Sequence, residues 1–349
     1  MPFGEIIIGS PGSGKSTYAF GKQQLLTALQ RPIAVVNLDP ANDHVPYKCD
    51  IDIASLISLQ DAMDEHGLGP NGGMLYCMEY LEANFDWLEE QLRSQNLLNG
   101  DAYVLFDVPG QVELSSDHGS LKSVVGKLEK LGFRLAAVHL CDAYYVTDAA
   151  KYVSVLLLSL RTMLHMGLPH VNVLSKLDLL SRYGDLGGYF SLSVFIKRTN
   201  ALTDFNLDFY TEVQDLSYLQ NVLSASHPRF SALNEAICGL VEDFSLVAFE
   251  TLAVEDKQSM LHLTRTIDRI LGYVFVQAPQ TDGNTPQGIG TLRPNQDALF
   301  TSAMGALPGH SIQDIQERWV DNREDYDAWE SRVWRKEGEE AAKRQGKNN

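Results

Sequence analysis

Short apolar runs alternate with longer segments of helical periodicity along the first three-quarters of this 349-residue chain. The runs predict strands, and their apolar continuity is typical of strands buried on both faces of a sheet. The predicted strands span residues 5–8, 33–37, 103–106, 136–140, 171–174 and 246–249. The predicted helices span residues 15–29, 75–94, 121–131, 149–166, 209–223, 230–242 and 256–271. This alternation predicts an α/β fold with a mostly parallel, doubly wound sheet and helices on both faces.

The pattern changes towards the end of the chain. Residues 277–310 collect Gly, Pro, Thr, Asn and Gln without periodic apolar positions, which predicts a flexible linker. In residues 311–349, apolar side chains fall at helical spacing among many charges, at Ile312, Ile315, Trp319, Tyr326, Trp329 and Val333. We therefore expect a compact domain over residues 1–276, then a linker, then a charged amphipathic helical tail. That tail helix either folds back on its own domain or docks on a partner.

A further helical insertion is expected within residues 182–208, where apolar side chains such as Tyr189, Phe190, Val194 and Phe195 occur. They pack in the core or line a groove for a client protein.

The charge balance excludes several classes of protein. The chain has 28 Lys and Arg against 45 Asp and Glu, a formal charge of −17. Such an acidic chain repels phosphate backbones and anionic lipid, so we expect neither a nucleic acid nor a membrane as a direct partner. Apolar runs last a handful of residues, whereas a membrane span takes about 20. The four cysteines are far apart and the N-terminus has no secretory pattern, which favours a cytoplasmic protein without disulfides or a zinc site.

Residues 9–16, which read G-S-P-G-S-G-K-S, match the phosphate-binding pattern G-x-x-x-x-G-K-[ST]. The motif follows a predicted strand and opens a predicted helix, so backbone N–H groups and the helix N-terminus can surround a phosphate. We expect Lys15 to reach the β- and γ-phosphates and Ser16 to bind Mg²⁺. The predicted nucleotide-binding residues of this P-loop NTPase motif are Gly12, Ser13, Gly14, Lys15, Ser16 and Thr17.

A second motif begins where an apolar strand ends at Asp107, the form expected of the acidic Mg²⁺ group in P-loop enzymes. Pro109, Gly110 and Gln111 follow, so the segment reads D-x-x-G-Q. In GTP-hydrolysing switches this glycine senses the γ-phosphate through its amide, and the glutamine can orient the attacking water. The motif favours hydrolysis over phosphoryl transfer to a metabolite.

A third motif, Ser175, Lys176, Leu177 and Asp178, fits [NTS]-K-x-D at the end of another strand. The carboxylate can accept both N–H donors on the guanine edge, while the lysine stem lies along the base. Adenine lacks that donor pair, so a guanine nucleotide is predicted.

Asp39 follows the second predicted strand, on the sheet edge where α/β proteins bind ligands. It either holds a water or Mg²⁺ or is a turn residue before Pro40.

Residues 69–82 read G-P-N-G-G-M-L-Y-C-M-E-Y-L-E, and with this segment the sequence resembles the GPN-loop GTPases. The family is named for a Gly-Pro-Asn insertion before the strand that ends at the acidic group. The resemblance covers residues 3–275, and residues 312–319 are similar to the C-terminus of fungal type-2 members. Read without the family, residues 69–72 would predict a β-turn.

The resemblance implies a GTPase that binds GTP or GDP with Mg²⁺ and forms a homodimer, or a heterodimer with a paralogue. It implies that Gly69, Pro70 and Asn71 lie at the dimer interface and that Asn71 stabilises the leaving phosphate of the partner's nucleotide. A carboxamide can donate hydrogen bonds to a developing anion, as an arginine finger does elsewhere.

The resemblance also makes Asp39, Gln111 and Glu113 candidates for arranging the attacking water and Mg²⁺. Val108 stands where the family often has Thr, and residues 247–252 match the guanine-packing segment only loosely. In the family these proteins assist assembly and nuclear import of RNA polymerase II and related polymerases. Polymerase subunits and assembly factors, and shuttling between cytoplasm and nucleus, are thus implied.

Three other classes of protein fit the sequence less well. A P-loop kinase would need an acceptor site and an arginine-rich lid, and no such arginine cluster stands out. A metallochaperone GTPase would need closely spaced Cys and His ligands, for which His44 and Cys49 are poor candidates. A GTP-binding scaffold without turnover would not need the complete set of Lys15, Ser16, Asp107 and Gln111.

Overall fold

The computed structural model describes residues 1–42, 44–99, 102–182, 207–213, 216–226 and 228–273, with the single positions 315, 319, 328, 332 and 335. The described residues form a seven-stranded sheet in the order β3-β2-β4-β1-β5-β6-β7, and its neighbouring strands pair in parallel. The strands are β1 (Phe3–Gly9), β2 (Ala34–Asn37), β3 (Ile51–Asp52), β4 (Tyr103–Asp107), β5 (Arg134–Asp142), β6 (His170–Ser175) and β7 (Phe249–Thr251). Parallel strands bring their carboxyl ends to one edge, so loops far apart in sequence meet there.

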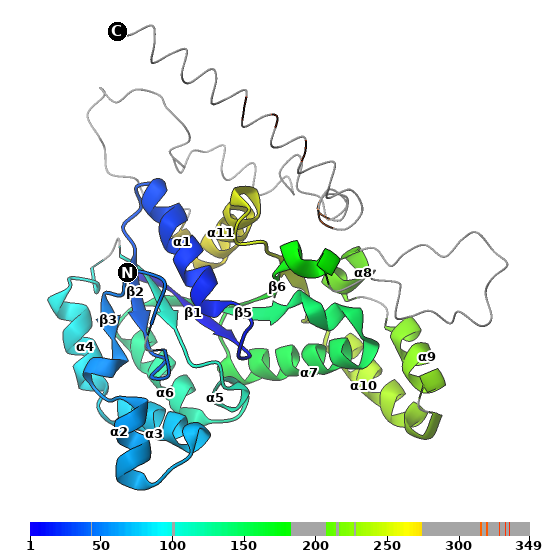
Figure 1. The fold of residues 1–349 in the computed structure, drawn as a ribbon, viewed down its shortest axis with the longest axis horizontal. Coiled ribbons are helices and arrows are strands. Elements are labelled where there is room, and N and C mark those ends of the chain that lie inside the picture. The colour runs from blue at the N-terminus through cyan, green and yellow to red at the C-terminus, as the bar shows by residue number, and fades with distance from the viewer. Residues whose placement is uncertain are drawn as a thin grey trace, which may run out of the picture.

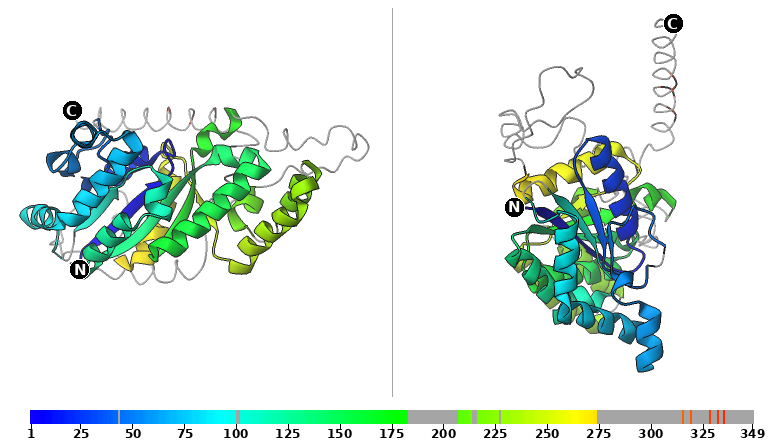
Figure 2. Two further views of the ribbon diagram at one scale, coloured as in Figure 1. Left: turned by 90° about the horizontal axis from the view of Figure 1, so that it is seen from below. Right: turned by 90° about the vertical axis from the view of Figure 1, so that its left-hand side faces the viewer.

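Helices cover both faces of this sheet, as predicted. The α-helices are α1 (Lys15–Ala28), α2 (Leu59–His66), α3 (Pro70–Ala83), α4 (Phe85–Ser94), α5 (Val112–Ser116), α6 (Gly119–Lys130), α7 (Ala149–Met166), α8 (Leu207–Glu212), α9 (Ser217–Ser226), α10 (Ser231–Phe244) and α11 (Lys257–Leu271). The 3₁₀ helices are η1 (Ile53–Ser55), η2 (Ala143–Thr147), η3 (Leu177–Arg182) and η4 (Pro228–Phe230). Figure 1 shows α1 and α11 on one side of the sheet and α6 and α7 on the other. Figure 2 shows α2 and α3 projecting from the body of the molecule.

Alternate residues of the buried strands pack on opposite faces. From β1, Ile6 and Ile8 enter a core with α3, α4 and α6, whereas Phe3 and Ile7 enter a core with α1 and α11. All seven residues of β1 are buried, which explains why its pattern is apolar apart from Glu5. Strand burial on both faces confirms the predicted doubly wound α/β class.

One ion pair lies inside the core on the α1 side. Lys22 Nζ is 3.0 Å from Glu5 Oε1, and both side chains are completely buried. Tyr18 donates to the other oxygen of Glu5 at 2.7 Å, and Tyr103 also donates to this carboxylate. The buried charge therefore has several partners, as burial of a charge requires.

Several predicted elements differ from the structure. The helix expected over residues 75–94 is two helices: α3 begins at Pro70, and α4 follows a break at Asn84. The helix expected over 209–223 is likewise divided into α8 and α9, and the last strand is Phe249–Thr251 rather than 246–249. Strand β3 and the short helices α2 and α5 were not predicted, because each is too short to establish a period.

A third apolar cluster joins α7, α8, α9 and α10 beside β7. Ile315 belongs to this cluster with 9% exposure, and Trp319 packs against it. The linker and most of the tail, like most of the insertion expected within residues 182–208, lie outside the described residues. In the described part of the chain, no helix is both long and apolar enough to span a membrane.

Candidate functional site

The phosphate-binding motif forms the loop between β1 and α1 at the carboxyl edge of the sheet. Gly9 has φ 150°, and a Cβ there would lie 2.4 Å from the carbonyl oxygen of Leu140, so only glycine fits. Gly12 and Gly14 also have positive φ, at 78° and 95°. The loop therefore needs glycine at these positions to turn its backbone amides inward before the helix.

Lys15 folds back over this loop. Its Nζ donates to the carbonyl oxygens of Gly9 at 3.2 Å and Ser10 at 3.4 Å. Burial lowers the pKa of Lys15, while Asp107 and Asp39 oppose that shift. A buried ammonium held by carbonyl oxygens is poised to exchange them for phosphate oxygens.

Asp107, at the end of β4, is the centre of a polar network. Ser16 donates to its Oδ2 at 2.9 Å and Tyr47 donates to the same oxygen at 2.8 Å. Asn42 in turn donates to Ser16 Oγ at 3.1 Å. Burial raises the pKa of Asp107, which is 1% exposed. Its Oδ1 is buried and has no hydrogen-bond partner among the described residues, as fits an atom that meets a cation or its water.

Asp39 lies where β2 leaves the sheet, and its carboxylate forms a turn. Its Oδ1 accepts from the backbone N–H of Ala41 at 3.0 Å, and its own N–H donates to Asn37 Oδ1 at 3.1 Å. Burial raises its pKa, and the charge of Lys15 acts in the opposite direction. Asp39 is therefore a turn residue, as one alternative predicted, and its charge also interacts with Lys15.

Two residues of the D-x-x-G-Q segment, Gly110 and Gln111, lie beside other predicted site residues. A Cβ added to Gly110 would lie 2.6 Å from Lys15 Nζ, so this glycine permits close contact with the phosphate-binding lysine. Gln111 Nε2 donates to Asn71 Oδ1 at 3.0 Å within the same chain. Glu113 lies in the first turn of α5 and is exposed, as is Thr17 in the first turn of α1.

The Gly-Pro-Asn segment is the beginning of a helix. Gly69 is the N-cap of α3 and Pro70 occupies the first helical position, where the missing N–H of proline costs nothing. The β-turn expected for these residues in isolation is therefore wrong. Asn71 is exposed and lies on the first turn of α3, where it accepts a hydrogen bond from Gln111, another predicted site residue.

The [NTS]-K-x-D segment lies beside the phosphate-binding loop. Ser175 Oγ donates to the carbonyl oxygen of Ser13 at 2.7 Å, although 162 residues separate the two. Lys176 has φ 61°, and its Nζ donates to Asp142 Oδ2 at 2.7 Å. A Cβ on Gly14 would lie 3.9 Å from Lys176 Cε, so the lysine stem borders the phosphate-binding loop.

The chain after Lys176 forms η3, with Leu177 buried and Asp178 in its first turn. The backbone N–H of Leu177 donates to Leu252 at 3.3 Å, so the end of β7 closes this side of the site.

Tyr47 and Asn42 were not predicted. Both come from the loop that joins β2 to β3, and neither belongs to a motif identified in the sequence. Tyr47 is 4% exposed although no strand or helix contains it. A tyrosine in a polar loop two residues after a valine gives no sequence signal that distinguishes a bond to Asp107 from ordinary packing.

Several known proteins are similar to this chain over most of its length. A family model described as "Conserved hypothetical ATP binding protein" matches residues 7–273. GPN-loop GTPase 2 of Danio rerio is 46% identical over 324 residues, covering 92% of this chain and 93% of its own length. GPN-loop GTPase QQT1 of Arabidopsis thaliana is 52% identical over 278 residues, covering 79% and 87%. GPN-loop GTPase 2 of Schizosaccharomyces pombe is 44% identical over 335 residues, covering 95% of each chain.

A crystal structure of a GTPase in apo form from Pyrococcus abyssi superimposes with a TM-score of 0.60 at 22% identity, covering 77% of this chain and 97% of that one. At this identity the likeness shows the fold. The family relationship is shown by the sequence matches, which extend over most of both chains, and the resemblance inferred from the motifs is confirmed: the chain belongs to the GPN-loop GTPases.

Proposed function

We propose that the protein is a Mg²⁺-dependent, dimeric GTPase switch that assists assembly and nuclear import of RNA polymerase II. The observation that carries its chemistry is the joint position of Lys15, Ser16 and Asp107 at one sheet edge, with Ser175 bonded to the same loop. These groups supply contacts for phosphates, for a cation and for a base. Membership of a family whose relatives are named GTPases favours hydrolysis over the kinase and scaffold alternatives.

Guanine is the proposed base, although the matching family model is described by ATP. Asp178 follows β6 beside the phosphate-binding loop, and its carboxylate can accept the two N–H donors that only guanine presents on that edge. An adenine there would leave the carboxylate without these donors, which costs binding free energy.

Mg²⁺ would be held by Ser16 Oγ and the carboxylate of Asp107, and Asp39, whose charge acts on both Lys15 and Asp107, would act through a water. The buried Oδ1 of Asp107 supports this assignment, because such an oxygen otherwise loses its hydration without compensation. When bound, the ion neutralises charge on the β- and γ-phosphates. Lys15 then contributes a second positive charge, and Gly110 lies near enough to the lysine to sense the γ-phosphate.

Asn71 is proposed to act in trans on the nucleotide of a partner subunit. Its carboxamide is exposed, and among the described residues it accepts a hydrogen bond from Gln111, the residue expected to orient the attacking water at the γ-phosphate. An exposed hydrogen bond contributes little net stability and can exchange with another acceptor or donor. Release of Asn71 would also free Gln111 to orient water, so dimerisation and hydrolysis would be coupled.

The proposed partners are a second copy or a paralogue, together with polymerase subunits and assembly factors. The proposed location is the cytoplasm with shuttling to the nucleus. Family membership is the support for these proposals. Capture of polymerase subunits by the protein loaded with a GTP analogue, compared with GDP, tests them, and equal or absent capture in both states contradicts a switch that handles this client.

The first experiment compares hydrolysis of GTP and ATP by the wild type, Asn71→Ala and Asn221→Ala, with mass in solution measured alongside. Asn221 is a matched control because it is an exposed asparagine on α9. We expect turnover per chain to rise with protein concentration. Asn71→Ala should lose about 100- to 1,000-fold of that turnover while still binding GDP, the range found when a transition-state donor is removed.

Any of three results would contradict this mechanism. Equal use of ATP would contradict the role of Asp178. A concentration-independent turnover, or an Asn71→Ala variant as active as Asn221→Ala, would contradict the action in trans.

A further inference from the structure

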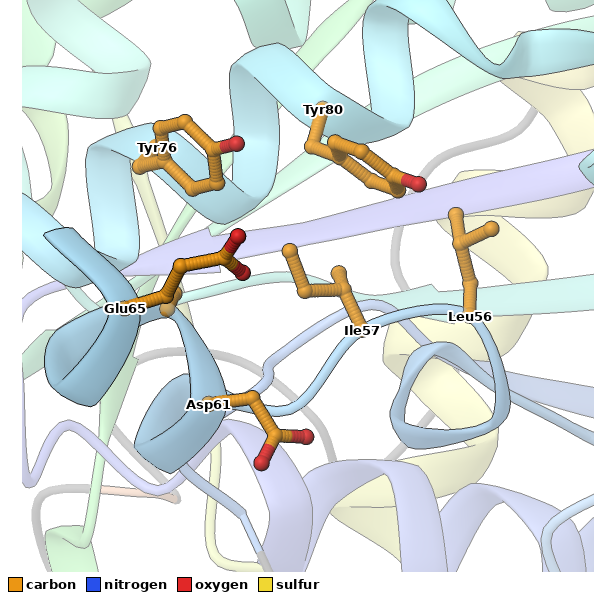
Figure 3. Close-up of a pocket in the computed structure, with 7 residues that line it drawn as sticks. Leu56, Ile57, Asp61, Glu65, Tyr76 and Tyr80 are labelled. Carbon is orange, nitrogen blue, oxygen red and sulfur yellow. The ribbon is translucent and has the colours of Figure 1, made fainter.

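A hollow of about 210 Å³ lies between α2 and α3, away from the phosphate-binding loop (Figure 3). Its apolar lining is Leu56, Ile57 and Ala62. One wall is aromatic, formed by Tyr76 and Tyr80 of α3. The remaining two lining residues are the acids Asp61 and Glu65 of α2. The hollow thus combines an apolar floor, two aromatic rings and negative charge, and no lysine or arginine lines it.

The two rings are held in a defined arrangement. Tyr76 and Tyr80 are one helical turn apart, with centroids 6.2 Å apart and planes inclined by 28°. His66 supports Tyr76 from α2 at a centroid distance of 4.3 Å. Tyr80 is 36% exposed, so its ring is accessible. Aromatic faces carry partial negative charge and attract cations that stack on them.

The two acids play different parts. Asp61 accepts a hydrogen bond from Ser58 at 2.7 Å, which belongs to the N-cap of α2, and its carboxylate points away from the rings. The carboxylate of Glu65 points into the space beside Tyr76 and Ile57 (Figure 3). Glu65 is exposed on the last turn of α2. A helix C-terminus is a poor place for an anion, so a cation beside Glu65 relieves an unfavourable interaction.

We propose that this hollow binds an arginine side chain from a basic segment of a partner protein. The volume is below the roughly 300–1,000 Å³ of small-molecule sites, so it suits one long side chain rather than a metabolite. An arginine places its aliphatic stem on Leu56 and Ile57, its planar guanidinium on the tyrosine faces and its N–H groups on Glu65. Lysine is the weaker ligand, because its ammonium is more strongly hydrated and does not stack as a plane.

Charge complementarity supports a basic segment over an apolar or acidic one. The chain carries a net charge of −17, which attracts basic segments over distance, and the hollow adds the local contacts that select arginine. This proposal goes beyond the GTPase function and does not depend on it. The hollow and the nucleotide site share only helix α3, so each can be disrupted separately.

Binding of fluorescein-labelled (Gly-Ser-Arg)₄ to the full chain tests the proposal by fluorescence anisotropy at about 150 mM salt. (Gly-Ser-Lys)₄ and the peptide with norleucine in place of arginine are the probes for comparison. The variants are Glu65→Gln, Tyr76→Leu and Tyr80→Leu, with Glu90→Gln as the control because Glu90 is an exposed glutamate on α4 outside the hollow. Retained GDP affinity and an unchanged melting temperature show that each variant folds.

The arginine peptide should bind most tightly, and each variant of the hollow should weaken it by at least about threefold while Glu90→Gln does not. Equal weakening by Glu90→Gln would mean that overall charge alone attracts the peptide, and would overturn the proposal. Equal or tighter binding of the norleucine peptide would assign an apolar occupant instead. A loss of self-association in Glu65→Gln or Tyr76→Leu would assign the hollow to a second copy of the chain and equally overturn it.

Discussion

Two hydroxyl groups share one oxygen of Asp107, and this arrangement gives Tyr47 a defined part in the site. Ser16 and Tyr47 both donate to Oδ2, which leaves Oδ1 without a partner among the described residues. A carboxylate held at one oxygen cannot rotate freely about its terminal bond. Tyr47 therefore orients Asp107 so that the other oxygen faces the position we assign to Mg²⁺ or its water.

Tyr47→Phe should raise the Mg²⁺ concentration needed for half-maximal GTP hydrolysis by about 3- to 30-fold, with less effect on the rate at saturating Mg²⁺. A shift of this size corresponds to about 0.7–2 kcal/mol, which lies between the value of an ordinary hydrogen bond and that of one to a charged group. The measurement is a Mg²⁺ titration of hydrolysis, together with Mg²⁺-dependent slowing of GDP release.

Tyr18→Phe is the control, because it removes another buried tyrosine hydroxyl that donates to a carboxylate, that of Glu5 in β1. An equal shift in Tyr18→Phe, or none in Tyr47→Phe, would reject a positioning role for Tyr47.

Two buried histidines predict a dependence of stability on pH. Burial lowers the pKa of His139 to about 4, and burial together with the charge of His139 lowers that of His170 to about 3, against an ordinary value of 6.5. The unfolded chain therefore binds more protons than the folded chain below about pH 6.5. The free energy of unfolding therefore keeps its full value above that pH and decreases as the pH falls towards 4.

Between pH 7 and pH 5 the two histidines should together remove about 2–4 kcal/mol of unfolding free energy. His170→Val places a strand-forming apolar residue at the start of β6 and should remove about half of this loss. Urea denaturation at the two pH values measures it. If the wild type and the variant lost the same free energy, a different group would be responsible.

At the scale of elements, local capping explains which helices could be predicted. Helix α7 was predicted at its observed bounds, because Asp148 caps its first turn by accepting from the N–H of Lys151 at 3.0 Å and Gly167 ends it with φ 67°. The break between α3 and α4 was missed. Apolar periodicity continues through it, and Asn84 ends α3 by donating to the carbonyl oxygen of Tyr80 at 2.8 Å, a bond that the residue type alone does not predict.

Close approach of α2 to α3 depends on Gly73. A Cβ there would lie 2.9 Å from both Leu59 Cδ1 and Met63 Cγ of α2, whereas a Cβ on the neighbouring Gly72 would be 3.5 Å from Leu68. Gly73→Ala should therefore overpack the contact, at a cost of about 1–3 kcal/mol that offsets the gain in helix propensity.

Gly72→Ala is the matched change, since it adds the same methyl group to the same helix without the clash and should stabilise by up to about 1 kcal/mol. Melting temperatures rank the two variants, and hydrogen exchange in residues 59–66 reports on α2. Faster exchange is expected in Gly73→Ala alone. Equal stability of the two variants would show that α2 shifts freely to accept the methyl group.

At the scale of the whole molecule, the sheet brings together motifs that the sequence separates. Ser13 and Ser175 are bonded, as are Ser16 and Asp107, because their strands end at one edge. Parallel strands with apolar continuity were predictable, so this assembly was predictable as well. The contacts of Tyr47 and Asn71 were not predictable, since they depend on how a loop and a helix N-terminus pack against that edge.

Two residues of the C-terminal tail contact the domain, and this contact allows the two alternatives for the amphipathic tail to be tested. Ile315 is buried within the cluster around α7 and α10, and Trp319 packs against that cluster. If the tail docks on its own domain, Ile315→Ala leaves a cavity in this cluster and should reduce the unfolding free energy by about 2–4 kcal/mol.

That loss has an upper limit, because a tail that docks weakly can detach. The unfolding free energy lost in Ile315→Ala then equals the docking free energy of the tail, and a further change at Trp319 causes no additional loss. Urea unfolding of Ile315→Ala, Trp319→Ala and the double variant measures the limit, with the exposed Arg332→Ala as the control. Additive losses would mean that the tail stays docked, whereas a double variant no worse than either single one would mean that it has been released. Stability equal to Arg332→Ala in all three would leave the tail helix free to dock on a partner.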